Sequence, residues 1–192
     1  KEKVLFFFGY VGTPTVTRVL PLLKGGFKQP QLLFFPFTGA QPQRMPPYDE
    51  ICFNLRASYR QETAGLIEHL YGAGCRKTGI YYQCDAYGRS GWEGVRRALP
   101  ARNLKLGGEA TYRRGSKYED SYARQVKILR DAGVDHVICV GAYAPCAGFI
   151  RDARDQGWNV PIANVSFVSS ETMLALLLKE GKKTNRDYTR FL

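Results

Sequence analysis

Short apolar runs alternate along this chain with amphipathic segments, and each run ends in a turn rich in Gly, Thr, Ser or Tyr. The runs cover residues 4–8, 32–36, 80–82, 136–140 and 162–165, and the turns after them cover 9–13, 37–40, 85–88, 141–143 and 166–167. Strands that alternate with helices predict an α/β fold with a mostly parallel sheet. Because ligands bind outside the carboxyl ends of parallel strands, these turns are the predicted binding site.

The length and composition predict a folded chain with a real core. The 192 residues fit one large domain or two small lobes, and 44% of them are apolar, which excludes a disordered chain. No apolar run approaches the roughly 20 residues that a membrane-spanning helix needs. Residues 1–3 are charged and lead directly into an apolar run, a start that we expect from a processed or truncated chain.

The formal net charge of +11, with an isoelectric point near 9.6, raises the question of a nucleic-acid partner. The cations are spread over nearly every predicted helix, and the densest patches are pairs: Arg96-Arg97, Arg113-Arg114 and Lys182-Lys183. No helix-turn-helix, zinc-finger or RNA-binding aromatic pattern accompanies them. The charge therefore predicts a scattered basic surface and no nucleic-acid binding, while attraction for anionic ligands or surfaces stays open.

The cysteines and histidines predict neither a metal site nor a cofactor. Five cysteines occur without a CxxC pair, namely Cys52, Cys75, Cys84, Cys139 and Cys146. Zinc sites need paired spacing or nearby histidines, and both His69 and His136 are expected to be structural. A disulfide framework is not expected, and a single bridge stays open.

Two groups of strand and helix patterns meet near Ser58-Tyr59. The predicted strands cover 4–8, 32–36, 51–55, 79–83, about 108–112, 136–140 and 161–165, and the predicted helices cover about 14–23, 61–71, a segment around Trp92, Val95 and Leu99, 118–132, 145–156 and 171–180. The Pro-rich stretch 41–47 is expected to lack regular structure. Two such groups predict two lobes with a cleft between them.

The turns carry groups that suit a small organic ligand with a carboxylate. Thr13 precedes Pro14 at a helix start, where it can cap the helix and also offer a hydroxyl and backbone N–H groups to an anion. Gly39 leaves backbone donors accessible. Tyr87 and Tyr143 place aromatic rings at the opposing rim. Each feature also has a plain structural interpretation, as a helix cap or an ordinary turn.

Motifs of the common enzyme classes are missing from the sequence. The phosphate-binding loop GxxxxGK[ST] and the GxSxG elbow are absent, and residues 9–12 do not complete a dinucleotide-binding GxGxxG. No spacing of Ser, His and Asp nominates a triad. We therefore predict that the protein is not an enzyme.

Six segments, in order, carry a resemblance to a known family. They are 9–15, 35–40, 53–59 with Glu62-Thr63, 82–88, 140–143 and 164–168. Over about residues 4–178 the chain resembles the substrate-binding proteins of branched-chain amino acid ABC transporters, which have the type I periplasmic-binding-protein fold. The resemblance implies two lobes, each a mostly parallel sheet flanked by helices. It assigns 1–58 to part of lobe 1, 59–180 to lobe 2 and 181–192 to a segment that returns toward lobe 1.

The same resemblance implies a periplasmic protein, exported by a signal peptide, that delivers its ligand to an ABC transporter permease and meets the membrane only there. Strand–helix units of the first lobe should precede residue 4, so a fragment is expected, with Arg186-Asp187-Tyr188 resembling part of a later helix. A ligand-sensing module of a receptor or transcription regulator with this fold stays open as an alternative. A small α/β enzyme is a third class, disfavoured by the missing catalytic set.

By position, the resemblance implies roles for individual residues. The ligand-binding set is Tyr10, Gly12, Thr13, Phe37, Thr38, Gly39, Ala40, Asp85, Tyr87, Ala142, Tyr143, Ser166 and Phe167. Thr13 and 37–40 match the carboxylate site, Tyr87 matches an aromatic ring that closes over the ligand, and either Ala142 or Tyr143 matches a second one. Leucine-type binders carry an acid where Ser166 stands, so a carboxylate without the amine is expected in preference to an amino acid. An amino acid stays open as the ligand if Asp85 supplies the counter-charge.

Overall fold

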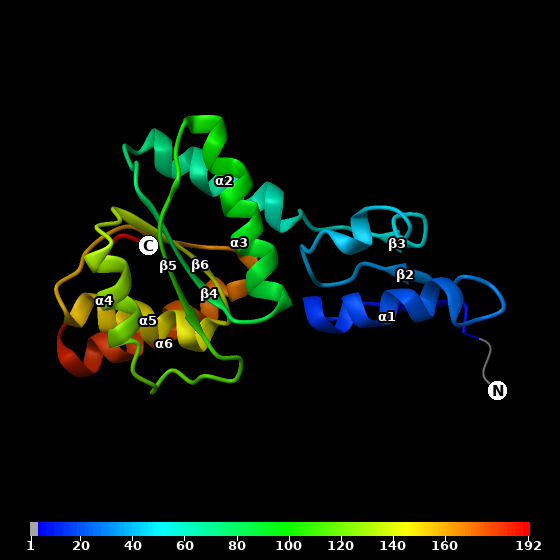
Figure 1. The fold of residues 1–192 in the computed structure, drawn as a ribbon. Coiled ribbons are helices and arrows are strands. Elements are labelled where there is room, and N and C mark those ends of the chain that lie inside the picture. The colour runs from blue at the N-terminus through cyan, green and yellow to red at the C-terminus, as the bar shows by residue number, and fades with distance from the viewer. Residues whose placement is uncertain (1–3) are drawn as a thin grey trace.

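The chain forms two parallel β-sheets that belong to two lobes lying side by side (Figure 1). They are seen in a computed structural model that describes residues 4–192. The first lobe contains β1 (Phe6–Phe8), α1 (Thr13–Gly25), β2 (Leu32–Phe34), the 3₁₀ helix η1 (Pro42–Arg44) and β3 (Cys52–Phe53). The chain then crosses to the second lobe, which holds the remaining elements. The predicted α/β fold class, with two lobes, is confirmed.

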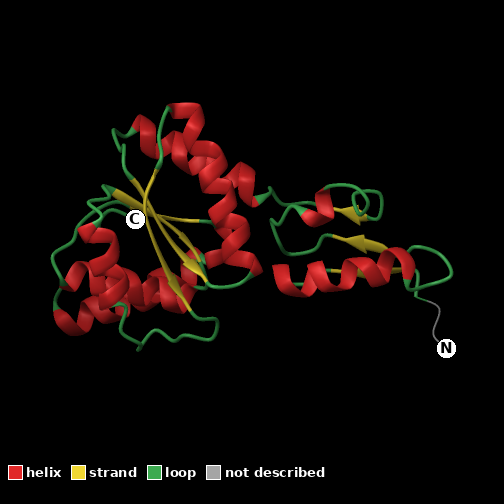
Figure 2. Ribbon diagram, in the orientation of Figure 1, coloured by secondary structure: helices red, strands yellow, loops and turns green. Residues whose placement is uncertain are grey.

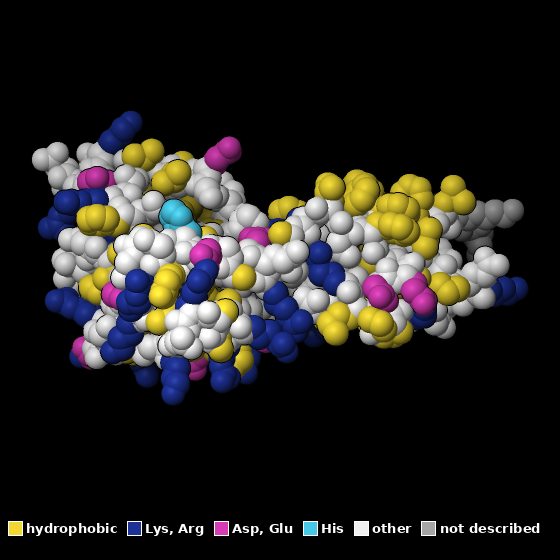
Figure 3. All heavy atoms as spheres, turned by 90° about the horizontal axis from the view of Figure 1, so that it is seen from above, with side chains coloured by type: hydrophobic (Ala, Val, Ile, Leu, Met, Phe, Trp, Pro, Cys, Tyr) yellow, Lys and Arg dark blue, Asp and Glu magenta, His cyan; other side chains and the backbone are white. Residues whose placement is uncertain are grey.

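The first lobe is a three-stranded sheet, in the order β1-β2-β3, with α1 packed on one face (Figure 2). Its core consists of Val16, Leu20, Leu23, Leu33, Ile51 and Cys52. On the other face the rings of Phe34 and Phe53 stack with centroids 4.6 Å apart, and Phe6 packs edge-on against Phe34 at 5.1 Å. Phe6, Phe8 and Phe53 are 45–68% exposed on this face, and Figure 3 shows hydrophobic side chains gathered along one side of the lobe.

The second lobe is a doubly wound sheet in the order β5-β4-β6-β7. Its strands are β4 (Thr78–Gln83), β5 (Leu106–Tyr112), β6 (His136–Val140) and β7 (Ile162–Asn164). The helices α2 (Tyr59–Gly72) and α3 (Ala86–Ala98) cover one face, while α4 (Ala123–Asp131), α5 (Tyr143–Asp155) and α6 (Ser170–Thr184) cover the other (Figure 1). Two short 3₁₀ helices, η2 (Leu99–Arg102) and η3 (Ser166–Val168), complete the lobe. Every residue of β4 and β6 is buried, as expected of central parallel strands.

The crossing between the lobes ends in a well-defined helix start. Ser58 caps α2: its hydroxyl accepts the N–H of Gln61 at 3.2 Å, and the Gln61 side chain accepts the N–H of Ser58 at 2.9 Å. This reciprocal pair satisfies donors that a helix start otherwise leaves unmade. The second lobe therefore begins on a fixed backbone at the place where the sequence predicted the junction. The assignment of 1–58 and 59–180 as separate domains stays a prediction.

Several predicted elements differ in detail from the structure. The Pro-rich stretch contains η1, so its prediction as wholly irregular was wrong. The helix predicted over 118–132 begins at Ala123, because the Tyr122 N–H is held by the Asp152 carboxylate at 2.6 Å and the preceding turns continue as a loop. Residues 186–188 are not helical.

The segment 181–192 packs against the second lobe. The Tyr188 hydroxyl donates to Asp155 at 2.8 Å, and the Ile162 N–H donates to the Phe191 carbonyl at 2.9 Å. A return of this segment toward the first lobe stays a prediction. All five cysteines are free thiols. None of the helices in the described part of the chain has the length and apolar character to span a membrane.

Candidate functional site

A cleft of about 220 Å³ lies between the start of α1 and the carboxyl edge of the second sheet. The first lobe contributes Val11, Gly12, Thr13 and Pro14 to its wall, and the second lobe contributes Gln83, Asp85, Tyr87, Arg114, Ala142 and Phe167. Figure 1 shows the start of α1 facing the second lobe. A larger hollow of about 440 Å³ lies between α6 and residues 185–189, but it is far from the strand ends where ligands of this fold class bind. The interlobe cleft is therefore the candidate site.

The start of α1 presents its positive end to the cleft. Gly12 occupies the cap position with φ of 92°, no side chain caps the helix, and Pro14 in the first turn has no N–H. The loop is fixed because the Gly12 N–H donates to the Phe37 carbonyl at 3.1 Å and the Phe37 N–H donates to the Tyr10 carbonyl at 2.7 Å. Uncapped helix starts attract carboxylates and phosphates. The first-lobe wall is thus suited to an anionic group.

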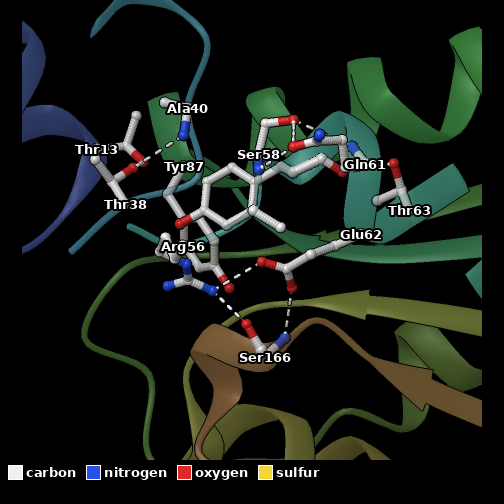
Figure 4. Close-up of polar contacts among 12 residues, drawn as sticks. Thr13, Thr38, Ala40, Arg56, Ser58, Gln61, Glu62, Thr63, Tyr87 and Ser166 are labelled. Atoms are coloured by element: carbon white, nitrogen blue, oxygen red, sulfur yellow. Dashed lines mark hydrogen bonds and ion pairs between the residues drawn. The ribbon is translucent and has the colours of Figure 1, made fainter. Parts of the chain in front are cut away.

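The Thr13 side chain is held by a second buried threonine. The hydroxyls of Thr13 and Thr38 lie 2.6 Å apart, and the Thr38 hydroxyl accepts the Ala40 N–H at 3.2 Å (Figure 4). Thr38 lies outside the cleft wall and is fully buried. Thr38 therefore orients the Thr13 side chain through this hydroxyl contact. Thr13 itself lies at the cleft because it is the first residue of α1.

Within the loop 37–40, Gly39 packs against the junction between the lobes. A Cβ added to Gly39 would lie 2.7 Å from Tyr59 Cδ1 and 2.8 Å from the Tyr59 nitrogen. The Gly39 carbonyl also accepts the Tyr59 N–H at 2.7 Å. Glycine at this position is explained by the close approach of α2, and Phe37, Gly39 and Ala40 do not line the cleft.

On the second lobe, Asp85 and Tyr87 line the cleft with their polar groups already bonded. Asp85 caps α3: one carboxylate oxygen accepts the N–H groups of Tyr87 at 2.9 Å and Gly88 at 3.2 Å, and the other accepts the Gln83 amide at 2.6 Å. The Tyr87 hydroxyl donates to the Gly141 carbonyl at 3.0 Å. Burial raises the pKa of Tyr87 well above its ordinary value, so the hydroxyl stays protonated. Asp85 is therefore a helix cap, and its role as a counter-charge for a ligand stays a prediction.

Ser166 lies in a cluster beside the cleft. Its N–H donates to one Glu62 oxygen at 2.8 Å, and its hydroxyl contacts the guanidinium of Arg56 (Figure 4). Arg56 donates to the other Glu62 oxygen at 2.8 Å, and both side chains are about 15% exposed. The Arg56 guanidinium also lies 4.8 Å from the Phe37 ring centroid. The position at which the family resemblance suggests an acid thus faces a cation of this chain.

The structure brings six of the thirteen candidate residues into the cleft wall, namely Gly12, Thr13, Asp85, Tyr87, Ala142 and Phe167. Of the pair Ala142 and Tyr143 it is Ala142 that lines the cleft, while Tyr143 is 42% exposed. Tyr10, residues 37–40 and Ser166 lie outside the wall. The binding role of each candidate stays a prediction.

Four wall residues were missed from the sequence: Val11, Pro14, Gln83 and Arg114. Arg114 had a usable signal, because the Arg113-Arg114 pair directly follows the strand predicted over 108–112 and so falls at the carboxyl edge of the sheet. The hydrophobic pattern of that strand is weak, so its carboxyl end, and with it Arg114, was not included among the candidate site residues. Gln83 is the last residue of β4, one position before the predicted turn.

A separate polar cluster lies at the opposite end of β6. Atoms of Cys75, Asp135 and His136 that can bind metals lie within 4.8 Å of one another. The Asp135 carboxylate already accepts the N–H groups of Arg76 at 2.8 Å and Lys77 at 3.0 Å, and it lies 2.6 Å from His136 Nδ1. These bonds tie the start of β6 to the loop before β4, which explains the cluster as a structural one.

Comparisons with known proteins place this geometry in a family. A solved structure described as a possible leucine/isoleucine/valine-binding protein from Rhodopirellula baltica matches at 28% identity and a TM-score of 0.78, covering 97% of this chain and 56% of that one. A branched-chain amino acid ABC transporter protein from Thermus thermophilus with bound valine matches at 19% identity and a TM-score of 0.78, over 90% of this chain and 44% of that one. A solute-binding protein of R. palustris in complex with 4-hydroxybenzoate matches at 19% identity and a TM-score of 0.76, over 94% and 48%.

The two matches at 19% identity show the fold alone, and the chain spans about half the length of the structures that it matches. No curated protein sequence matches the chain. A model of the family described as periplasmic binding protein matches residues 1–184. With its two α/β lobes and interlobe cleft, this chain belongs to the periplasmic binding protein family, as the sequence resemblance implied.

Proposed function

We propose that the protein is an extracytoplasmic solute-binding protein that captures a small carboxylate-bearing ligand in the interlobe cleft and delivers it to an ABC transporter permease. The observation that carries this proposal is the cleft itself, in which the uncapped start of α1 on one lobe faces the turns of the other. Family membership supports the transport role, since the family and its structural neighbours are solute-binding proteins. On this proposal the protein acts in the periplasm after export by a signal peptide, and it performs no chemistry on its ligand.

The size of the cleft favours a small ligand. About 220 Å³ is below the range of about 300–1,000 Å³ that is typical for drug-sized ligands. The aromatic rings of Tyr87 and Phe167, with centroids 4.8 Å apart, contribute an apolar wall. A compact acid with an apolar or aromatic body matches these features. Two solved structures at 17–19% identity are complexes with 4-hydroxybenzoic acid, and one holds valine, but at this distance the choice rests on the residues of this chain.

Those residues favour a ligand without an α-amine. Ser166 is uncharged and bonded to Arg56 and Glu62, and the Asp85 carboxylate is occupied by three hydrogen bonds. A ligand ammonium in the cleft would therefore lack a free acidic partner, and a buried charge without a partner is costly. The carboxylate of such a ligand would instead find hydrogen-bond donors in the backbone N–H groups at the start of α1.

Calorimetric titration of the intact protein tests this proposal. Leucine is compared with 4-methylpentanoic acid, which is leucine without the amine, and with 4-hydroxybenzoic acid. Loss of one charged hydrogen-bond partner weakens binding by about 1.5–3 kcal/mol, so we expect leucine to bind roughly ten- to a hundredfold more weakly than the better acid. Leucine binding more tightly than both acids would refute the preference, and absence of binding by every acid would refute carboxylate capture.

A further inference from the structure

Arg114 brings a positive charge into the cleft from the second lobe. It follows β5, in the loop that leads toward α4, and it lines the cleft together with Asp85 and Ala142. Its side chain is exposed and makes no ion pair within residues 4–192, so the guanidinium is open to a ligand in the cleft.

Asp85 forms no ion pair with Arg114 within residues 4–192. It is the one acidic residue in the described cleft wall, and its two oxygens accept from Tyr87, Gly88 and Gln83. Its charge compensates the positive end of α3, which it caps. The wall therefore holds two separate attractions for anions: the uncapped start of α1 on the first lobe and the guanidinium of Arg114 on the second.

We propose that Arg114 is a specificity-determining residue and that the ligand carries a second acidic group, which Arg114 binds. This inference rests on the proposed function, because it concerns the same cleft. A guanidinium recognises a carboxylate through two parallel N–H···O bonds. The ligand class is a small dicarboxylate whose two acids bind to opposite lobes, with its apolar body against Tyr87 and Phe167.

The placement on opposite lobes gives the second acid a particular effect. A monocarboxylate at the α1 start interacts electrostatically with one lobe, whereas a dicarboxylate joins both. A ligand that binds the α1 start and Arg114 at the same time favours the arrangement in which both lobes line one cleft, because the two anion sites belong to different lobes. The second acid thus increases the affinity of the ligand and also favours approach of the two lobes.

The test uses benzene-1,4-dicarboxylate and benzoate as matched probes, with succinate and butanoate as an aliphatic pair. Calorimetry on the intact protein measures both members of each pair for the wild type, for Arg114→Gln and for Arg113→Gln. Arg113 is the matched control because it is the adjacent exposed arginine and lies outside the cleft wall. Thermal unfolding of each variant checks that the fold is retained, and Arg114→Lys tests whether a point charge replaces the guanidinium.

We expect at least one dicarboxylate to bind tenfold or more tightly than its monocarboxylate partner in the wild type. Arg114→Gln should remove this difference because it weakens the dicarboxylate more than the monocarboxylate, Arg114→Lys should keep part of the difference, and Arg113→Gln should keep it within twofold. Equal or weaker binding of both dicarboxylates, or an equal loss in the Arg113 variant, would overturn the inference while leaving monocarboxylate capture intact. Absence of binding by all four probes would overturn the inference where 4-methylpentanoic or 4-hydroxybenzoic acid still binds, and would refute the proposed function where neither acid binds.

Discussion

Arg56 and Glu62 form an ion pair of 2.8 Å at the junction between the lobes, and each side chain is about 15% exposed. Arg56 lies between β3 and α2, while Glu62 lies in the first turn of α2. The pair also holds η3, because Glu62 accepts the Ser166 N–H and Arg56 contacts the Ser166 hydroxyl. One ion pair thus connects the crossing segment to two elements of the second lobe.

Replacement of Arg56 should destabilise the protein more than replacement of an exposed arginine. Arg56→Gln removes the cation that pairs with Glu62 and leaves the largely buried carboxylate with the Ser166 N–H as its donor. We therefore expect a loss of about 1.5–3 kcal/mol in the free energy of unfolding. The matched control is Arg97→Gln, whose 2.8 Å pair with Glu93 is 61% and 41% exposed and should contribute about 0–1 kcal/mol. Urea unfolding measures both, and equal losses would show that the junction pair has no special weight.

Gly39→Ala should destabilise the junction by steric overlap. The added Cβ meets the Tyr59 backbone nitrogen at 2.8 Å, and such overpacking costs about 1–3 kcal/mol. Gly65→Ala, inside α2 with no atom within 4 Å of the new Cβ, should instead stabilise the protein by about 0.5–1 kcal/mol. Thermal unfolding should therefore shift in opposite directions for the two variants, and a shift in the same direction contradicts the packing argument.

Asp135 should make stability depend on pH in the acid range. Burial raises the pKa of its carboxyl, but hydrogen bonds from Arg76, His136 and Lys77 outweigh burial and hold the pKa below its ordinary value of 3.8. Because the folded pKa is lowered, this contribution is fully present above pH 3.8 and is lost as the pH falls through the folded value. The unfolding free energies of wild type and Asp135→Asn in urea should differ near neutral pH and approach each other as the pH falls from 3.8 through the folded pKa. A constant difference across this range would exclude the carboxylate as the cause.

Ligand binding should bring the lobes together about the segment near Ser58-Tyr59. The cleft is lined from both lobes, so a ligand that contacts both walls favours the closed arrangement. Small-angle scattering of the intact protein should give a smaller radius of gyration at saturation with the best-bound acid than without it. A radius that does not change at a concentration shown by calorimetry to saturate the site speaks against hinge closure.

Local sequence patterns predicted the fold where burial alone decides structure. The strand expected over 136–140 is β6 without change, because a five-residue, β-branched apolar run between two turn signals favours a central strand. The helix expected from residue 118 begins at Ala123, since the Arg151 guanidinium holds the carbonyls of Tyr118 and Asp120 at 2.7 Å and 2.9 Å in a loop. That arginine is about 30 residues away, beyond the reach of a periodicity argument.

The candidate site was likewise predictable only in part from the sequence. The carboxyl-edge rule identified Thr13, Asp85 and Tyr87, because strand ends fix the position of the residues that follow them. It could not fix where side chains point. Gly39 faces Tyr59 and Ser166 faces Arg56 because of contacts between elements distant in sequence.

The phenylalanine face of the first lobe has a practical consequence for measurements on the 192-residue chain. Side chains of this kind, left in water, bind hydrophobic dyes and adhere to one another, increasingly so in sulfate and at the concentrations that calorimetry uses. Phe6, Phe8 and Phe53 are positioned to do this in the 192-residue chain. Phe8 lies outside the cleft wall, so a variant such as Phe8→Ser should improve the solubility of the chain without changing which acid binds.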